Sequence, residues 1–315
     1  MPRPRRLAAA GFVLVASCAF ATSGPLARAA RPADPLLVAA ARVLIAAVFL
    51  ALLDPRGVIR DLRALPRRAT AKIFLVGALL GAHFALFLCG LDRTSLPAGI
   101  SLVSLEPLSV VLWAWLLFRE RPTRAEQVGV LLATAGAVVV AQDAGEGEHR
   151  LLGDLLVVGA VLLFGLYVAA ARLLKDTLPP RTYAAAVYGC AAISLCVVLP
   201  FLPAAPGTTR APPGMSWLAI LGVAFIPTVI GHTSVQTAAR SLPPATVALV
   251  SPGETLGGIA IGLALMRATP KPLEIVGAAI ILVGSLVAIF AIRPVPPREA
   301  TVEPRPAPAA EHEGS

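Results

Sequence analysis

The chain has 315 residues, of which 57% are hydrophobic and only 14% are charged, and its mean hydropathy is +0.79. A soluble domain carries about 25% charged residues, so this composition excludes an ordinary soluble enzyme or binding domain. The formal net charge is +9, but the basic residues are spread over many short segments, which argues against a nucleic-acid partner.

Ten apolar segments follow one another along the chain, each close to the roughly 20 residues that cross a bilayer. The connections between them are too short to hold a soluble domain. The sequence therefore predicts an all-α integral membrane protein with ten transmembrane helices, over residues 7–27, 36–53, 72–91, 96–118, 125–142, 151–174, 182–202, 216–239, 243–266 and 273–292.

The first segment has features of a targeting signal as well as of a span. Its basic start, its apolar run and the lipobox-like Val-Ala-Ser-Cys at 15–18 fit a cleaved signal or a lipid anchor. However, Phe20 and Arg28 match Phe164 and Arg172 at a spacing of 144 residues, so the second half of the chain keeps an equivalent segment. We therefore expect the first segment to be retained as a helix.

The two halves of the chain resemble each other most clearly at a spacing of 148 residues. Because each half contains five spans, an odd number, the second half must cross the membrane in the opposite sense. Inverted repeats of this kind are a hallmark of secondary transporters, whose substrate site lies near the midplane between the halves. The matched pairs are Glu106 with Glu254, Arg119 with Arg267, Pro122 with Pro270, Glu126 with Glu274, Gly129 with Gly277 and Gly136 with Gly284.

The division of the chain follows from this duplication. We expect a first repeat over residues 1–142, a second, inverted repeat over 143–292 and a disordered, Pro- and Glu-rich tail over 293–315. With the N-terminus in the cytoplasm, 19 of the 27 lysines and arginines fall in cytoplasmic segments, and the outer segments carry only 7. By the positive-inside rule, both termini should lie in the cytoplasm and the protein in the cell (inner) membrane.

Glu106 and Glu254 each lie near the centre of an apolar span. A charged side chain at such a position costs about 2.5–3.5 kcal/mol, so each carboxylate must be paired, neutralised or in contact with water. Pro107 in the first span and Pro252 with Gly253 in the second should loosen the helix beside the carboxylate. The carboxylates either bind protons or cations during function, or have a structural role in holding broken helices together.

Other polar residues in or near the spans are candidates too. Arg42 either faces an anionic substrate, pairs with a glutamate or extends to the outer interface. His83 and His232 occupy corresponding spans and either relay protons or form hydrogen bonds between helices. Gln236 lies about one turn beyond His232, and Asp154, at the edge of its span, is expected to be solvated.

Two stretches of the sequence resemble a known family. Residues 105–140 (LEPLSVVLWAWLLFRERPTRAEQVGVLLATAGAVVV) and 231–254 (GHTSVQTAARSLPPATVALVSPGE) look like the EamA-type permeases of the drug/metabolite transporter superfamily. The resemblance implies ten helices around a central cavity that opens to alternate sides, and export or exchange of small organic solutes. It also implies an arginine near the position of Arg42 and cavity-lining positions for Ser23 and Tyr167.

The second half departs from the family pattern, since no proline follows Glu254 and Ala268 stands where the first half has Glu120. The sequence as a whole predicts a secondary transporter that exports or exchanges a small organic metabolite, amino-acid-like or a related solute, by alternating access and without a cofactor or a metal. The alternatives are an intramembrane enzyme with a Glu/His cleft and a membrane sensor or scaffold that transports nothing. The oligomeric state stays open, with a homodimer among the options.

Overall fold

The computed structural model describes residues 3–142, 149–172, 174, 177–239 and 250–291, with backbone only at residues 3–10, 171–172, 236–239 and 291. The first half contains α1 (Arg3–Ala21), α2 (Ser23–Ala29), α3 (Pro35–Leu52), α4 (Pro55–Arg63), α5 (Arg67–Leu91), α6 (Leu96–Val103), α7 (Glu106–Phe118) and α8 (Arg124–Ala141). The second half contains α9 (Leu151–Arg172), α10 (Pro180–Val198), η1 (Leu199–Phe201), α11 (Gly214–Val223), η2 (Ala224–Gly231), α12 (His232–Ala239), α14 (Val250–Met266) and α15 (Pro272–Ala291). The predicted tail from residue 293 lies outside these ranges.

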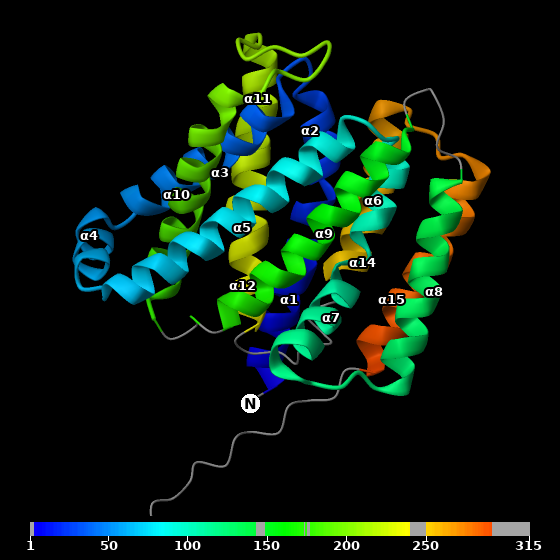
Figure 1. The fold of residues 1–315 in the computed structure, drawn as a ribbon, viewed down its shortest axis with the longest axis horizontal. Coiled ribbons are helices and arrows are strands. Elements are labelled where there is room, and N and C mark those ends of the chain that lie inside the picture. The colour runs from blue at the N-terminus through cyan, green and yellow to red at the C-terminus, as the bar shows by residue number, and fades with distance from the viewer. Residues whose placement is uncertain (1–2, 143–148, 173, 175–176, 240–249, 292–315) are drawn as a thin grey trace, which may run out of the picture.

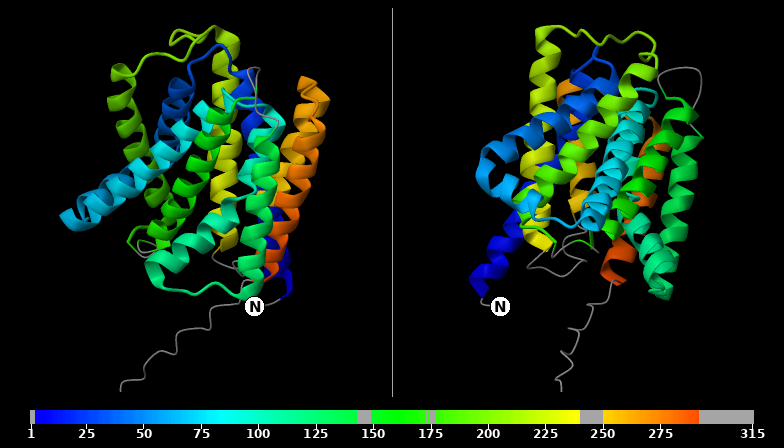
Figure 2. Two further views of the ribbon diagram at one scale, coloured as in Figure 1. Left: turned by 45° about the vertical axis from the view of Figure 1, so that its right-hand side comes forward. Right: turned by 60° about the vertical axis from the view of Figure 1, so that its left-hand side comes forward.

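The predicted membrane fold is confirmed. Over the described ranges, nine helical stretches are long and apolar enough to cross a bilayer, and the shorter apolar α14 takes the place of the remaining predicted span. Large apolar side chains on the outside of the bundle are freely exposed, for example Leu131 and Leu265, as expected where lipid replaces water. The helices stand side by side in one bundle, with α1, α9 and α14 near its middle (Figures 1 and 2).

The inversion of the two repeats is visible where α8 packs against α15. These matched helices run in opposite directions along one edge of the bundle (Figure 1). A Cβ atom added at Gly129 would lie 2.6 Å from the carbonyl oxygen of Gly284, and one added at Gly136 would lie 2.8 Å from that of Gly277. The glycines that match in sequence therefore cross over in space, as two equivalent helices must do when they pack antiparallel.

The turns that lead into α8 and α15 repeat the same backbone geometry. Arg119 and Arg267, which end the preceding helices, have φ values of 57° and 54°. Glu126 then accepts a hydrogen bond from the backbone N–H of Thr123, and Glu274 accepts one from the backbone N–H of Lys271. The spacing of 148 residues thus preserves a left-handed turn and an N-terminal carboxylate cap in both halves.

Helix interruptions occur near the polar residues, though not all where we expected them. The span that holds Glu106 breaks between Val103 and Glu106, directly before Pro107, as predicted. The prediction for the second carboxylate was wrong, because α14 runs unbroken from Val250 through Glu254. Pro252 lies in the first described turn of this helix, where a backbone N–H is not needed.

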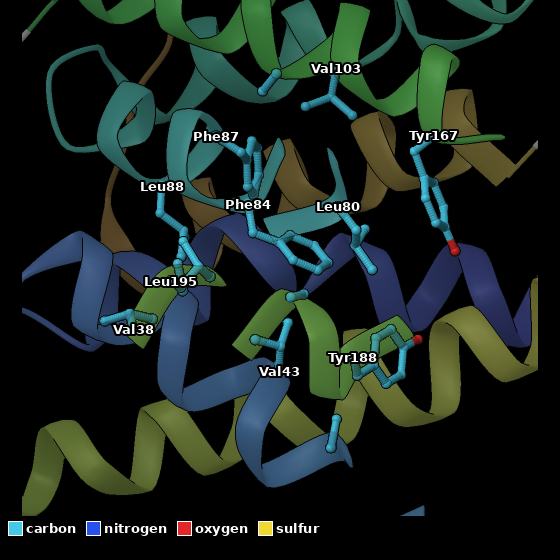
Figure 3. Packing of buried hydrophobic residues seen from close by; sticks show 14 of the residues in the cluster. Val38, Val43, Leu80, Phe84, Phe87, Leu88, Val103, Tyr167, Tyr188 and Leu195 are labelled. Atoms are coloured by element: carbon cyan, nitrogen blue, oxygen red, sulfur yellow. The ribbon is translucent and has the colours of Figure 1, made fainter. Parts of the chain in front are cut away.

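A second interrupted span, which was not predicted from the sequence, contains a π-helix. The span that begins with α11 becomes a π-helix over Ala224–Gly231, with Pro227 inside it, before continuing as α12. π-Helical turns are rare and are frequently found at functional sites. This one delivers Thr228 and His232 to the centre of the bundle, beside the buried apolar cluster that includes Val43, Phe84 and Tyr188 (Figure 3).

Candidate functional site

A narrow pocket, with a cavity volume of about 30 Å³, lies within the bundle and takes its lining from both repeats. Six of the predicted site residues line it: Ser23, Arg42, His83, Glu106, His232 and Glu254. The remaining lining residues are mostly apolar and were not predicted: Phe20, Phe84, Phe87, Val103, Phe164 and Pro227. The structure therefore brings the scattered intramembrane polar residues of the sequence to one place.

Two predicted residues are not among the described lining, for different reasons. The ring of Tyr167 is buried and its centroid lies 6.3 Å from that of Phe164, so it packs against a lining residue and is not itself among them. The side chain of Gln236 lies outside the described residues.

The two carboxylates reach the pocket from opposite repeats. Glu106 is the first residue of α7, where the unpaired N–H groups of a helix start favour a negative charge. Glu254 comes from the first turns of α14. In the described part of the chain, neither carboxylate has a hydrogen bond or an ion pair. Two like charges in one apolar pocket repel each other, so the site favours a proton or a cationic group between them.

The helix break before Glu106 is held in place by hydroxyl groups of the second repeat. Pro107 has no N–H, so the carbonyl oxygen of Val103, four residues earlier, loses its usual helical donor. Ser251 donates to that oxygen at 3.2 Å. Ser285 donates to the carbonyl oxygen of Ser104 at 2.5 Å. The break that positions Glu106 therefore depends on side chains from α14 and α15.

Arg42 is the most deeply buried charged residue of the pocket, with only 1% of its surface exposed. Its Nε atom donates to Thr228 Oγ1 at 3.0 Å, and its guanidinium carbon lies 4.0 Å from the ring centroid of Phe84. Thr228 in turn donates to the carbonyl oxygen of Val223, five residues back in the π-helical turn. The Nη1 atom is buried, and no hydrogen-bond partner for it occurs in the described ranges.

This geometry bears on the alternatives for Arg42. The side chain is directed into the bundle and is only 1% exposed, so it does not extend to the membrane interface in this structure. It forms no ion pair with Glu106 or Glu254 within the described residues. A buried guanidinium donor without a partner is costly, so it favours an anionic ligand group in the pocket.

The two histidines both pack near the ring of Phe84. The ring centroids of His83 and His232 are 5.0 and 6.0 Å from that of Phe84. His83 Nδ1 donates to the carbonyl oxygen of Ala160 at 2.8 Å, which fixes its tautomer and leaves Nε2 as an acceptor. His232 packs edge-on against Phe20 at 4.9 Å. Packing and a hydrogen bond between helices thus account for much of their environment, while both still border the pocket.

One prediction outside the pocket was wrong. Asp154 was expected to be solvated at the edge of its span, but only 3% of its surface is exposed. It accepts hydrogen bonds from Thr94 and His149. Its burial could not be inferred from its position in α9, because its partners come from segments far away or before the helix.

These features define a multi-pass membrane protein built from two inverted repeats that enclose a polar pocket. The chain belongs to the EamA-like transporter family, whose model matches residues 7–142 and again 151–290. The two matches cover both repeats, as the resemblance in the sequence implied.

Several relatives are similar over most of the chain. The uncharacterized transporter YwfM of Bacillus subtilis (strain 168) is 25% identical over 294 residues, which cover 93% of this chain and 96% of the relative. The uncharacterized transporter YyaM of the same organism is 26% identical over 236 residues, 72% of this chain and 75% of the relative. A crystal structure with 22% sequence identity has a TM-score of 0.61 and covers 90% of this chain and 96% of that one, which supports the fold.

Proposed function

We propose that the protein is a secondary transporter that moves a small zwitterionic, amino-acid-like solute across the cell membrane by alternating access. The observation that carries this proposal is that one pocket holds a basic side chain and two acidic side chains that form no ion pairs with one another in the described structure. Arg42 Nη1 is buried without a partner among the described residues, and Glu106 and Glu254 line the same pocket. A molecule with one anionic and one cationic end satisfies both.

The anionic end of the solute is assigned to Arg42. The guanidinium is already held by Thr228 and by the ring of Phe84, so little rotational freedom is lost when it binds. A hydrogen bond between charged groups is roughly twice as strong as a neutral one. A carboxylate or a similarly sized anionic group at Nη1 therefore supplies the largest single polar contact.

The cationic end and the apolar part follow from the remaining lining. An ammonium group near Glu106 and Glu254 relieves the repulsion between the two carboxylates. Phe20, Phe87 and Phe164 offer aromatic faces to an apolar side chain of the solute.

Proton coupling is a further part of the proposal. A solute cation and a proton would compete for the same pair of carboxylates, so protonation of Glu106 or Glu254 would release the solute. Transport that is unaffected by collapse of the pH gradient, and by glutamine at both positions, would eliminate this coupling.

Flux assays test the transport proposal. Purified protein in proteoliposomes, or everted membrane vesicles, is given radiolabelled amino acids and related zwitterions. Saturable uptake that competes with unlabelled solute is expected for at least one of them, and R42Q should abolish it. Saturable binding without flux would instead favour a sensor, and product formation would favour an enzyme.

The orientation is also a proposal, supported by the excess of basic residues in the segments assigned to the cytoplasm. Single cysteines in the 54–72 and 143–150 segments should react with a membrane-impermeant reagent from opposite sides. Labelling of both from the same side would contradict the orientation and the five-span repeat.

A further inference from the structure

A second buried polar cluster lies at the end of the bundle opposite the start of α1. There, α6, α9 and α15 all begin, and the segment between α5 and α6 meets them (Figure 1). The cluster consists of Thr94, Ser95, His149, Asp154 and Glu274. His149, Asp154 and Glu274 are 3% exposed or less, so three ionisable groups are removed from solvent together.

His149 lies between the two carboxylates of the cluster. Its Nε2 atom donates to Asp154 Oδ2 at 2.8 Å. Its Nδ1 atom lies 3.2 Å from Glu274 Oε1, within ion-pair distance but outside hydrogen-bond geometry. A cationic imidazolium between two carboxylates offsets the cost of burying them, and loss of its proton would leave both charges without a cation between them.

The cluster connects the two repeats. Thr94 donates to Asp154 Oδ1 at 2.6 Å, and Ser95, the N-cap of α6, donates to Glu274 Oε1. The backbone N–H of Arg150 donates to the carbonyl oxygen of Arg93 at 3.0 Å. The segment before α6 in the first repeat is thus joined to the starts of α9 and α15 in the second.

The opposite end of the bundle provides an internal comparison. Glu126, the counterpart of Glu274, also caps its helix, but it is only half-buried and its partner is the capping residue Thr123. The first helices of the two repeats match at a spacing of 144 residues, which places the counterpart of His149 at Arg5, whose side chain lies outside the described residues. The helix cap is therefore shared by both ends, whereas the sequence has no histidine at the position that corresponds to His149.

The charges around the cluster are of both signs. Burial disfavours the charged imidazole, but the contacts with Asp154 and Glu274 more than offset this and raise the pKa of His149 to about 9. Arg93 donates to the carbonyl oxygen of Cys89, so it is directed to the backbone. Other charged residues nearby are Arg28, Arg150, Lys271 and the ion pair of Arg31 with Asp92, and Asp143, Glu146 and Glu148 precede His149 outside the described residues.

We propose that the His149–Asp154–Glu274 cluster is a proton-dependent latch that closes this end of the transport pathway. The proposal rests on alternating access, because opening this end requires the segment before α6 and the start of α15 to separate. Separation breaks the contacts of Glu274 with Ser95 and His149. In the proposed orientation the latch faces the outside, so it regulates exposure of the central pocket to that side.

The direction of the pH effect follows from the proton on His149. In the closed state the imidazole holds its proton more tightly than it does when exposed. The latch is therefore at full strength below about pH 6.5, the ordinary pKa of histidine, and weakens as the pH rises towards 9. Alkaline conditions should favour the state that is open at this end.

Distance measurements between spin labels test the latch without any substrate. Labels are attached to cysteines replacing two exposed residues, Leu152 in α9 and Thr269 before α15. Leu152 reports on the segment before α6, because Thr94 and Arg93 join that segment to the start of α9. The four native cysteines, Cys18, Cys89, Cys190 and Cys196, are first replaced by alanine. In nanodiscs, we expect a single short distance at pH 6 and at least a tenfold larger share of a longer distance at pH 9.5.

Two variants separate the latch from a general effect of pH. H149Q removes the titrating group and should show the longer distance at both pH values. E126Q changes the matching cap at the other end and should leave the pH response unchanged.

An unchanged distance between pH 6 and pH 9.5 would overturn the latch, and so would a normal pH response in H149Q. If H149Q does not fold, the distances measured at pH 6 and pH 9.5 in the labelled protein that keeps His149 still test the latch. Because no solute is present, a failure to find a transported solute would count against the proposed function and not against the latch.

Discussion

Ser251 of the second repeat donates a hydrogen bond to the carbonyl oxygen of Val103 in the first repeat, at 3.2 Å. That oxygen is the one that Pro107 leaves without a helical donor. The irregular backbone that sets Glu106 at a helix start is thus completed from the other repeat. Non-helical backbone is tolerated at membrane depth only where such partners or a water-filled cavity exist, so the duplication and the site depend on each other.

S251A should destabilise the protein. The substitution leaves the Val103 carbonyl oxygen buried without its donor, which costs about 1 kcal/mol for hydrogen bonds of this kind in membrane proteins. The measurement is the apparent melting temperature in detergent. S194A is the matched control, because Ser194 donates to the carbonyl oxygen of Cys190 within a single helix, and it should change the melting temperature less. Equal effects of the two variants would contradict the role given to Ser251.

Much of the architecture could be predicted from the sequence because the bilayer imposes a simple rule. Apolar segments of about 20 residues must be helices, and an odd number in each repeat forces the inversion. The same rule identified Glu106, Glu254 and Arg42 as candidate site residues, because a charged side chain inside the bilayer is energetically costly unless it is paired or in contact with water.

The remainder of the site depends on contacts between segments that are distant in the chain. Phe84 became recognisable as a site residue only once Arg42 was found above its ring. Thr228 depends on a π-helical turn, for which Pro227 within an apolar run was the single available signal. The burial of Asp154 depends on Thr94 and His149, and no periodic pattern in the sequence connects these residues.

G129A should destabilise the packing of α8 against α15. The added methyl group would lie 2.6 Å from the carbonyl oxygen of Gly284, so the two helices would have to move apart. Overpacking of this kind typically costs about 1–3 kcal/mol. The apparent melting temperature in detergent should fall.

G189A is the control for this effect. Gly189 in α10 has nothing within 4 Å of an added Cβ, and alanine favours a helix over glycine by about 1 kcal/mol. Its melting temperature should therefore stay the same or rise. A drop of similar size in both variants would show that the close approach of α8 and α15 is not what limits stability.

R42K should bind the solute at least tenfold more weakly, although it keeps the positive charge. Lysine cannot donate to Thr228 and to the solute with the fixed geometry of the guanidinium, and it loses the stacked contact with Phe84. Binding to purified protein is measured by isothermal calorimetry or by thermal shift with the transported solute. R60Q removes an exposed arginine that pairs only with its neighbour Asp61 in the described structure, and should not alter the affinity. Unchanged affinity in R42K would remove the proposed anion contact.

The stability of the whole protein should also depend on the protonation of His149. Since the pKa of His149 in the folded protein is raised to about 9, from about 6.5 when it is exposed, the folded state holds the proton more tightly. The resulting stabilisation is complete below about pH 6.5 and is lost progressively as the pH rises through 9. Melting temperatures recorded between pH 6 and pH 9.5 should therefore fall with increasing pH, and H149Q should flatten this part of the profile. In E274Q one of the two carboxylates is neutral, so the pKa of His149 should move down and the fall should begin at a lower pH. A profile for E274Q that is identical to that of the unaltered protein would show that Glu274 does not hold the proton on His149.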